Sequence, residues 1–223
     1  MIHSSDDIKA TLIDGLSQLG LKLDDEVIDK TVAYFQLLLS RNQSVNLISP
    51  KQDIQTQTVV HLVDSLSLLL IDDLPHQAAA LDFGSGGGLP AIPLCLARPD
   101  WRYTLVESTG KKAAFLSFVK NELKLDQIAV VNRFLEAGKN TENVLYDFIT
   151  ARAVSDVGNL AAIAGPRLKV DGLFVAYKGP YGLAEIEASR AELKKRRLAL
   201  IDQRNFILPL VKAGRTFLIF KKI

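Results

Sequence analysis

A glycine-rich turn between an apolar run and a helical pattern restricts the possible folds of this chain more than any other segment. The segment reads Leu-Asp-Phe-Gly-Ser-Gly-Gly-Gly-Leu-Pro over residues 81–90. Because glycine has no Cβ, the backbone there can adopt positive φ angles and approach a bound molecule closely. The helix expected after Leu89 would add unpaired N–H groups, and Pro90 suits its first turn. The segment predicts a strand–turn–helix unit that binds a ligand through its backbone.

The spacing of the glycines separates two kinds of nucleotide site. Dinucleotide-binding proteins carry G-x-G-x-x-G, with an acidic residue about 20 positions further on. Here Asp82, Gly84, Gly86 and Gly88 occupy alternate positions, so the third glycine comes one position early. A nicotinamide-dependent oxidoreductase is therefore the weaker alternative, also because the sequence nearby offers neither a Tyr-Lys nor a Cys-His catalytic pair.

The pattern after residue 78 predicts an α/β fold, because short β-rich runs alternate with helical segments. We expect a mostly parallel sheet covered on both faces, with the last two strands pairing antiparallel because only a loop separates them. The expected strands are 81–83, 103–106, 128–131, 148–151, 173–177, 199–208 and 216–220. The expected helices are 90–97, 111–123, 157–164 and 184–196.

The first part of the chain is predicted to be an all-helical cap. Apolar residues recur at helical spacing over residues 8–19, 25–39 and 54–70, and residues 42–50 are predicted to be a loop in which Asn46 forms a turn or cap. We divide the chain into a cap, residues 1–75, and an α/β domain, residues 76–223. In the third helix, His61, Asp64 and Ser65 share one stripe, which favours a polar network between cap and sheet over a hydrolase triad.

Composition bounds the possible partners and compartments. An apolar share of 48% over 223 residues supplies a core, and a net charge of +2 means that a polyanion must be met by a local patch. The one cysteine, Cys95, excludes an intramolecular disulfide and a cysteine-based zinc site, and we expect it to be buried. We predict no metal. Neither a signal peptide nor an apolar segment of about 20 residues is visible, so we expect a cytoplasmic protein without membrane contact, and a monomer.

The candidate site residues come just after expected strands. Glu107 follows the second strand, residues 132–136 the third, Arg152 the fourth and Lys178 the fifth. In a doubly wound sheet the ligand lies beyond the carboxyl ends of the strands, where the strand order reverses. A carboxylate at the position of Glu107 suits a neutral diol and repels a phosphate. The sequence thus predicts a single cleft at this edge of the sheet.

Several fragments together resemble one family within the S-adenosylmethionine-dependent class I methyltransferases. These are Asn42 with Asn46-Leu47-Ile48, His61-x-x-Asp64-Ser65-Leu66, the glycine turn with Leu89-Pro90-x-Ile92-Pro93, Glu107-Ser108-x-Gly110-Lys111-Lys112, Ala151-Arg152-Ala153-Val154, and Lys178-Gly179. The combination resembles the bacterial 16S ribosomal RNA guanine-N7 methyltransferase family, also called glucose-inhibited division protein B. Two positions depart from that pattern, since Arg41 stands where tryptophan is common and Leu135 where an acidic residue is common.

The resemblance implies a Rossmann-like class I methyltransferase fold with a seven-stranded sheet and S-adenosylmethionine as the cofactor. It implies methylation of N7 of a guanine in the 530 loop of 16S rRNA, either free or in the 30S ribosomal subunit. At residues 134–135 it implies that adenine is contacted largely through the backbone. The cofactor-binding residues that it implies are Asp82, Gly84, Gly86, Gly88, Leu89, Glu107, Phe134, Leu135 and Arg152.

The chemistry of that reaction indicates which catalytic groups the protein needs and which it does not. Guanine N7 is an acceptor on the major-groove edge of the base, so it needs no general base, and catalysis of a direct in-line transfer is mostly alignment. We assign Arg152 as the catalytic residue that positions the guanine or a phosphate; the alternative is a surface ion pair with Asp156. Arg133, Lys178 and Arg215 are assigned to RNA binding. A small-molecule methyltransferase and a non-catalytic RNA-binding protein of the same fold stay open as alternative functions.

Overall fold

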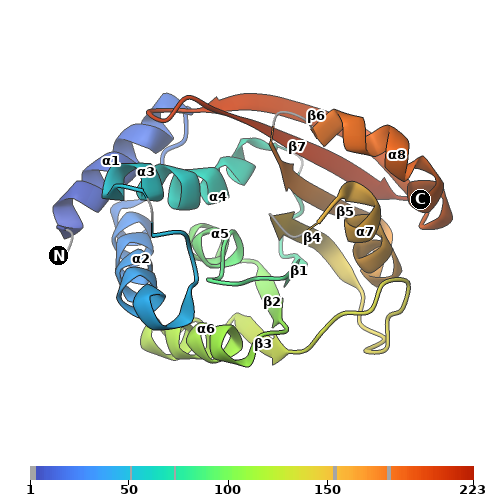
Figure 1. Ribbon diagram of the computed structural model, residues 1–223, viewed down its shortest axis with the longest axis horizontal. Helices are drawn as coiled ribbons and strands as arrows, with labels where there is room; N and C mark the ends of the chain where they lie inside the picture. The colour runs from blue at the N-terminus through green and yellow to red at the C-terminus, as the bar shows by residue number, and fades with distance from the viewer. Residues whose placement is uncertain (1–3, 51, 73, 153–154, 180–181) are drawn as a thin grey trace.

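A seven-stranded sheet runs through the middle of the protein in the computed structural model of the chain, which describes residues 4–50, 52–72, 74–152, 155–179 and 182–223 (Figure 1). The strand order is β3-β2-β1-β4-β5-β7-β6. Neighbours from β3 to β5 pair in parallel, and β6 pairs antiparallel with β7, as predicted. β7 is also antiparallel to β5, which the sequence did not indicate. The strands are β1 (Ala79–Phe83), β2 (Arg102–Glu107), β3 (Ile128–Asn132), β4 (Tyr146–Arg152), β5 (Leu168–Lys178), β6 (Leu198–Leu208) and β7 (Ala213–Lys222).

The helices of the α/β domain follow the predicted order, and those of the cap depart from it in two places. α2 continues through Val45 into the predicted loop and ends at Asn46, whose φ of 55° caps it in the left-handed conformation. The predicted third helix is broken by a π-helical and a 3-10 turn. The helices are α1 (Ser5–Gln18), α2 (Asp25–Val45), α3 (Ile54–Thr58), π-helix η1 (Val59–Val63), α4 (Asp64–Leu66), 3-10 helix η2 (Ser67–Leu70), α5 (Ala91–Ala97), α6 (Gly110–Glu122), α7 (Val157–Ala164), 3-10 helix η3 (Gly165–Arg167) and α8 (Gly182–Lys195).

Alternation along the strands gives the sheet two apolar faces. In β5, Val175 and Tyr177 belong to a core cluster with residues of α1, α2, α5 and α6, whereas Phe174 and Ala176 belong to a second cluster with residues of α7 and α8. Figure 1 shows these two groups of helices on opposite sides of the sheet. Because successive side chains of a strand point to opposite faces, the sheet is covered on both sides, as the sequence predicts.

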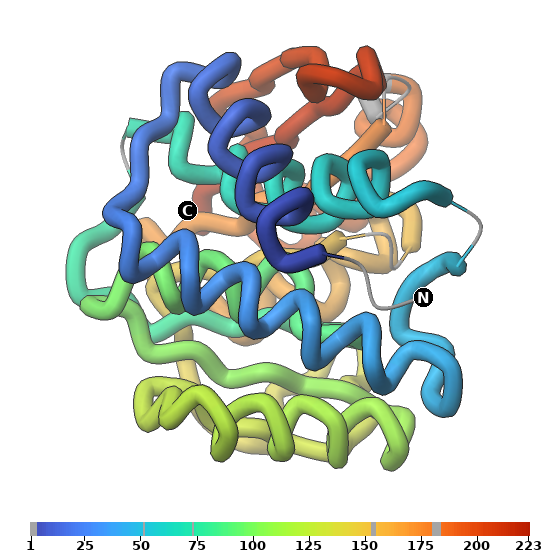
Figure 2. The backbone as a smooth tube through the Cα atoms, turned by 90° about the vertical axis from the view of Figure 1, so that its left-hand side faces the viewer, coloured from blue at the N-terminus to red at the C-terminus, as the bar shows by residue number. Residues whose placement is uncertain are grey.

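The helical cap packs on the face of the sheet that carries α5 and α6. Figure 2 views the molecule from this side, with α1 and α2 in front. The larger core cluster combines cap residues such as Leu12 and Phe35 with Leu94 of α5 and Phe217 of β7, and it contains the buried Cys95. In addition, the Tyr34 hydroxyl of α2 donates to the Gly87 carbonyl at 2.7 Å. The cap therefore contacts the glycine turn directly. The division at residue 75 stays a prediction.

Candidate active site

The glycine turn follows β1 and takes the backbone conformation that its sequence predicts. Gly84, Gly86 and Gly88 have φ angles of 69°, 55° and 91°. A Cβ on Gly88 would lie 2.3 Å from Cδ1 of Ile92 and 3.0 Å from Cδ2 of Leu116, so this position needs glycine both for its conformation and for space. Pro90 is the N-cap of α5 and stands just before its first turn. The turn thus places backbone atoms at the carboxyl end of β1.

Glu107 ends β2 beside this turn, and its carboxylate is oriented by backbone N–H groups. Oε2 accepts a hydrogen bond from the Gly86 N–H at 2.9 Å, and Oε1 accepts one from the Thr109 N–H at 2.7 Å. A carboxylate oxygen can accept a second hydrogen bond. The side chain is thereby preorganised to accept hydrogen bonds from a diol while the bonds that orient it stay in place.

Asp82 lies in β1 at the base of the turn, where its carboxylate is almost entirely buried. Oδ1 accepts a hydrogen bond from the Thr150 hydroxyl at 2.9 Å, while Oδ2 has no partner among the described residues. Burial raises the pKa of this carboxyl to about 7, against the opposing effects of Ser85, Thr150 and Arg152. An orphaned buried carboxylate oxygen is a group that a ligand's cation would satisfy.

The segment after β3 completes this side of the cleft. The Arg133 N–H donates to the Glu107 carbonyl at 3.1 Å, which holds residues 133–135 beside Glu107. The side chain of Phe134 is exposed, whereas that of Leu135 is buried in the core cluster with Val106. The side chain of Leu135 is thus part of the core, and the predicted backbone contact with adenine stays a prediction. Leu89, in the turn, is buried as well.

These groups fit S-adenosylmethionine in three respects. The oriented carboxylate of Glu107 suits the ribose hydroxyls, the orphaned Oδ2 of Asp82 suits the ammonium group of the methionine, and the glycines allow close approach to the backbone. The structure brings the predicted residues of β1, β2 and the segment after β3 to neighbouring strand ends. The binding roles of the individual residues stay predictions.

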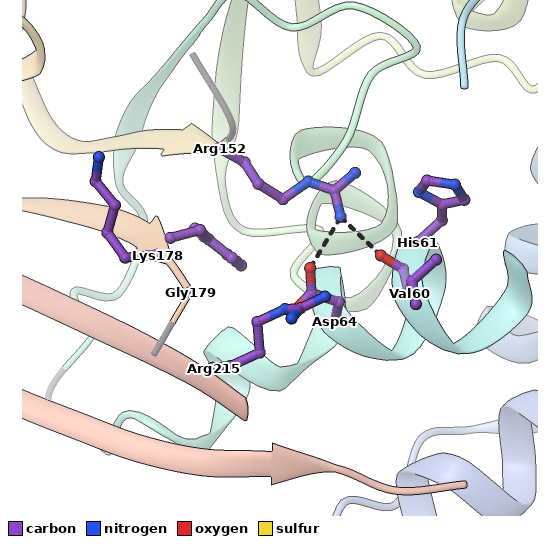
Figure 3. A pocket seen from close by; sticks show the side chains of 8 residues that line it. Val60, His61, Asp64, Arg152, Lys178, Gly179 and Arg215 are labelled. Carbon is purple, nitrogen blue, oxygen red and sulfur yellow. Dashed lines mark hydrogen bonds and ion pairs between the residues drawn. The ribbon is translucent and has the colours of Figure 1, made fainter. Parts of the chain in front are cut away.

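A second cavity, of about 400 Å³, lies between the cap and the ends of β4, β5 and β7. Figure 3 shows side chains from these four parts of the fold facing one another around it. Arg152 lines this cavity at the end of β4, the strand next to β1, and its predicted contact with the cofactor stays a prediction. The cavity is lined by Val60, His61, Asp64, Arg152, Tyr177, Lys178, Gly179 and Arg215.

Asp64 joins two arginines from different strands at the centre of this cavity. Its Oδ2 lies 3.1 Å from Nη1 of Arg152, and its Oδ1 lies 3.0 Å from Nε of Arg215. The side chain of Asp64 is 5% exposed, that of Arg152 15% and that of Arg215 24%. The predicted polar network between cap and sheet is thus confirmed for Asp64, but not for the side chains of His61, whose nitrogens have no partner among the described residues, and Ser65, whose hydroxyl donates to the His61 carbonyl within its own helix. The alternative pairing of Arg152 with Asp156 is wrong, because the Asp156 carboxylate instead caps α7 by accepting from the Asn159 N–H.

The π-helical turn explains how the cap reaches Arg152. The Asp64 N–H donates to the carbonyls of Val59 and His61, so it does not satisfy the Val60 carbonyl as it would in a regular α-helix. That carbonyl accepts a hydrogen bond from Nη1 of Arg152 at 3.1 Å. One turn later, the Ser65 carbonyl accepts one from the Tyr177 hydroxyl at 3.0 Å. π-Bulges are frequent at functional sites, and here the extra residue frees an acceptor for the active-site arginine.

The predicted RNA-binding cations lie in two places. Lys178 lines the cavity, where its ammonium group lies 2.7 Å from Glu185 and 2.6 Å from the Ser155 carbonyl. Arg215 lines it too, paired with Asp64. Arg133 lies on the cofactor side, half exposed, and pairs with Glu142. His61 also lines the cavity, and the sequence alone did not assign it a role in the site. Its place in the polar stripe with Asp64 and Ser65 was the only sequence signal that pointed to it.

Comparison with known proteins decides the family. A family model described as rRNA small subunit methyltransferase G (GidB) matches residues 27–221. The chain belongs to this family. Ribosomal RNA small subunit methyltransferase G of Alkaliphilus metalliredigens is 32% identical over 217 residues, which cover 96% of this chain and 90% of that protein. The protein of the same name from Chromobacterium violaceum is 38% identical over 180 residues, 79% of this chain and 82% of that protein.

Solved structures confirm the predicted fold. A methyltransferase from Pyrococcus furiosus superposes with a TM-score of 0.59 at 14% identity, covering 85% of this chain and 96% of that one. Precorrin-6y C5,15-methyltransferase from Geobacter metallireducens gives a TM-score of 0.53 at 16% identity, covering 78% and 92%. The protein therefore has the class I methyltransferase fold.

Family and fold together make the protein a methyltransferase whose cofactor is S-adenosylmethionine. Two findings on other kinds of site apply to the part of the chain that the structure describes. There, no helix is long and apolar enough to cross a membrane, and no group of three His, Cys, Asp or Glu side chains could hold a metal ion.

Proposed function

We propose that this enzyme methylates N7 of a guanine in the 530 loop of 16S rRNA, free or within the 30S subunit. Its relatives are named as methyltransferases of small-subunit rRNA. The observation that carries the proposal is the cavity in which Arg152 and Arg215 converge on Asp64, directly beside the cofactor side of the cleft. Such a substrate would place the enzyme in the cytoplasm, and we expect it to act there as a monomer.

In the proposed reaction, the main task of the protein is to align guanine N7 with the methyl group that is transferred. When bound, S-adenosylmethionine supplies an electrophilic methyl group. Guanine N7 carries a lone pair and no proton, so the chain has no proton to remove from it. In keeping with this, both carboxylate oxygens of Asp64 are engaged by arginines. The cavity residues instead hold the base in line with the group transferred, which can contribute about 7–11 kcal/mol in favourable cases.

Arg152 is the residue best placed to hold the base. Its bonds to the cap, to Val60 and Asp64, both use Nη1. Because a guanidinium carries five N–H donors in a fixed plane, Nε and Nη2 can donate to guanine O6 or a phosphate oxygen. The cap thereby aims the arginine and leaves its other donors to the substrate.

The two parts of the chain divide the work in this proposal. Residues 76–223 supply the cofactor side, with the glycine turn and Glu107. Residues 1–75 supply one wall of the acceptor cavity, with Val60, His61 and Asp64. We infer that the cap is an integral part of the active site, since the larger core cluster runs through both parts.

Arg133, Lys178 and Arg215 are proposed to contact the RNA backbone. Removal of one phosphate-binding cation should reduce the slope of log K against log salt by about 0.7–0.9. The double variant Arg133→Ala, Lys178→Ala should therefore bind 16S rRNA with a slope that is shallower by about 1.5. An unchanged slope would remove both residues from the interface.

The test of the function is transfer of labelled methyl from S-adenosylmethionine to 16S rRNA and to 30S subunits that lack the modification. A single N7-methylguanine mapped to the 530 loop is the expected result. Arg152→Ala should reduce turnover at saturating S-adenosylmethionine at least 100-fold, a larger factor than its loss of affinity for S-adenosylmethionine measured by calorimetry. No label in either substrate, from protein that binds the cofactor, would point to a small-molecule acceptor or to a binding-only role.

A further inference from the structure

His61 presents a polar ring in the acceptor cavity whose nitrogens are unused. Both Nδ1 and Nε2 are buried, and neither has a hydrogen-bond partner among the described residues. The ring lies on the π-helical turn, with its centroid 6.3 Å from that of Phe35. Figure 3 shows it on the same side of the cavity as Val60, facing the guanidinium of Arg152. Buried polar groups in proteins normally have partners, so these nitrogens point to a ligand.

The other charged groups of the cavity are engaged with one another. Asp64 pairs through one oxygen with Arg152 and through the other with Arg215, while Lys178 pairs with Glu185. Arginine and lysine donate hydrogen bonds and cannot accept them. Each oxygen of Asp64 already accepts a hydrogen bond from an arginine. Among the described charged and imidazole side chains that line the cavity, His61 is therefore the one whose acceptor has no partner at all.

Guanine needs such an acceptor if its base is to be recognised. It differs from adenine by donors at N1–H and at the exocyclic N2 amino group and by the acceptor O6. The arginines can satisfy O6 or a phosphate, but they offer nothing to the two donors. A pocket built only of cations would thus leave the distinguishing donors of guanine unpaired, which is costly in a buried site.

We propose that His61 is a specificity residue of the acceptor cavity, whose unprotonated ring nitrogen accepts a hydrogen bond from the N1–H or the N2 amino group of the target guanine. The proposal rests on the function proposed above and names the base-recognising residue of that site.

The surroundings of His61 keep it neutral. Burial, followed by the charges of Arg152 and Arg215, lowers the pKa of the imidazole to about 3. The groups that line the same cavity are Asp64 on the following turn, Arg152 on β4, Tyr177 and Lys178 on β5, and Arg215 on β7. A neutral imidazole has one donor and one acceptor nitrogen, whereas an imidazolium has no acceptor. The ring is thus in the form that the proposed contact requires.

The first measurement compares kcat/KM for 16S rRNA in three variants. His61→Ala should reduce kcat/KM roughly 10- to 100-fold, the effect of removing a hydrogen bond to a buried group. His61→Gln keeps an acceptor and a donor. Its decrease in log(kcat/KM) relative to wild type should therefore be at most two thirds of the decrease seen with His61→Ala. His76→Ala, at an exposed histidine of the same chain, is the control and should leave kcat/KM unchanged. Thermal midpoints and affinity for S-adenosylmethionine report whether each variant is folded.

A structural role is separated from direct contact by changing the base as well as the protein. Ligated 16S rRNA would carry inosine, which lacks the N2 amino group, or 2-aminopurine, which lacks both N1–H and O6, at the target position. If His61 accepts from a group that the analogue lacks, His61→Ala should reduce kcat/KM less than threefold on that analogue. A smaller effect with inosine identifies the N2 amino group as the donor, and one with 2-aminopurine alone identifies N1–H, because the accepting nitrogen of His61 cannot bind the acceptor O6. Multiplicative effects with both analogues would overturn the proposal.

The outcome also distinguishes this proposal from the function on which it rests. If the wild-type enzyme does not methylate the guanosine-containing rRNA, the proposed function is wrong, and the proposal for His61 is wrong with it. If the wild-type enzyme methylates it and His61→Ala does so equally well, only the role of His61 is wrong.

Discussion

The two sides of the cleft are built in different ways. The proposed cofactor side consists of backbone, the carboxylate of Glu107 oriented by backbone, and the buried carboxylate of Asp82, within residues 82–135 and on three adjacent strands. The acceptor side consists of side chains from the cap, β4, β5 and β7, and its central contacts, Asp64 with Arg152 and Arg215, join residues 88 and 151 positions apart. The first side depends on local conformation, and the second depends on the packing of the whole chain.

This difference predicts different consequences of substitution. Replacing the ligand-binding carboxylate on the cofactor side should reduce affinity for S-adenosylmethionine and leave the global fold largely intact, whereas adding a Cβ to the glycine turn should also reduce stability, because the turn has no space for it. Changes on the acceptor side should reduce stability and turnover together, because the same ion pairs hold the cap on the sheet and orient the arginines. Four experiments test this contrast, beginning with the greatest change expected.

The largest effect is expected for Glu107→Gln. It removes the charge that accepts from Gly86 and Thr109 and that we assign to the ribose hydroxyls. Hydrogen bonds to charged groups contribute about 1.5–3 kcal/mol each. Loss of the two bonds assigned to the ribose hydroxyls should therefore reduce affinity for S-adenosylmethionine, measured by calorimetry, by about 150-fold or more. The exposed Glu26→Gln is the control. An unchanged dissociation constant would show that Glu107 does not hold the ribose.

Gly88→Ala separates backbone strain from crowding in the glycine turn. The substitution places a non-glycine residue at a φ of 91°, and its Cβ would collide with the side chains of Ile92 and Leu116. The unfolding free energy should therefore fall by about 2–4 kcal/mol. Gly20→Ala is the matched control, because its φ is 75° and its added Cβ meets nothing within 4 Å in the described structure. It should cost only about 1–2 kcal/mol. Equal decreases in urea unfolding would mean that crowding at Gly88 is relieved by its neighbours.

Asp64→Asn tests the acceptor side. It leaves two largely buried guanidinium groups, of Arg152 and Arg215, without their shared counter-charge. We expect the unfolding free energy to fall by about 2–3 kcal/mol, below the range for fully buried pairs because both arginines keep some exposure. Methyl transfer should fall with it, while affinity for S-adenosylmethionine changes little. A variant as stable as wild type would show that the ion pairs do not hold the cap.

Asp82→Asn tests the buried carboxylate by pH. Because the folded-state pKa of about 7 lies above the ordinary value of 3.8, protonation of Asp82 stabilises the folded state at low pH, and this contribution disappears as pH rises toward 7. Between pH 5 and pH 8 the unfolding free energy of the wild-type protein should therefore fall by about 2–3 kcal/mol more than that of Asp82→Asn. The two proteins are compared without cofactor. Parallel stability curves would contradict the raised pKa.

Local patterns predicted the α/β fold and most of its elements. The alternation of β-rich runs and helical segments after residue 78 anticipated each strand and the antiparallel final pair, although the strands are longer than expected. The sequence did not predict the breaks in the cap, because a single π-turn inserts only one residue into a helical segment and leaves its apolar pattern recognisable as a helix. The extension of α2 to Val45 was also not predicted. The polar residues of its last turn have the composition of a loop, and only tertiary packing shows that they are helical.

The cofactor side could be read from the amino-acid sequence alone, from the glycine spacing with Asp82 to the carboxylate of Glu107 at a strand end. Glycine conformation and strand periodicity are local properties, so residues near one another in the chain carry the whole signal. Three features of the acceptor side needed the folded chain: Arg152 pairs with Asp64 and not with Asp156, Arg215 shares that carboxylate, and His61 faces the cavity with no partner among the described residues. Those contacts arise where the cap packs against distant strands, and no spacing along the chain specifies which charges will meet there.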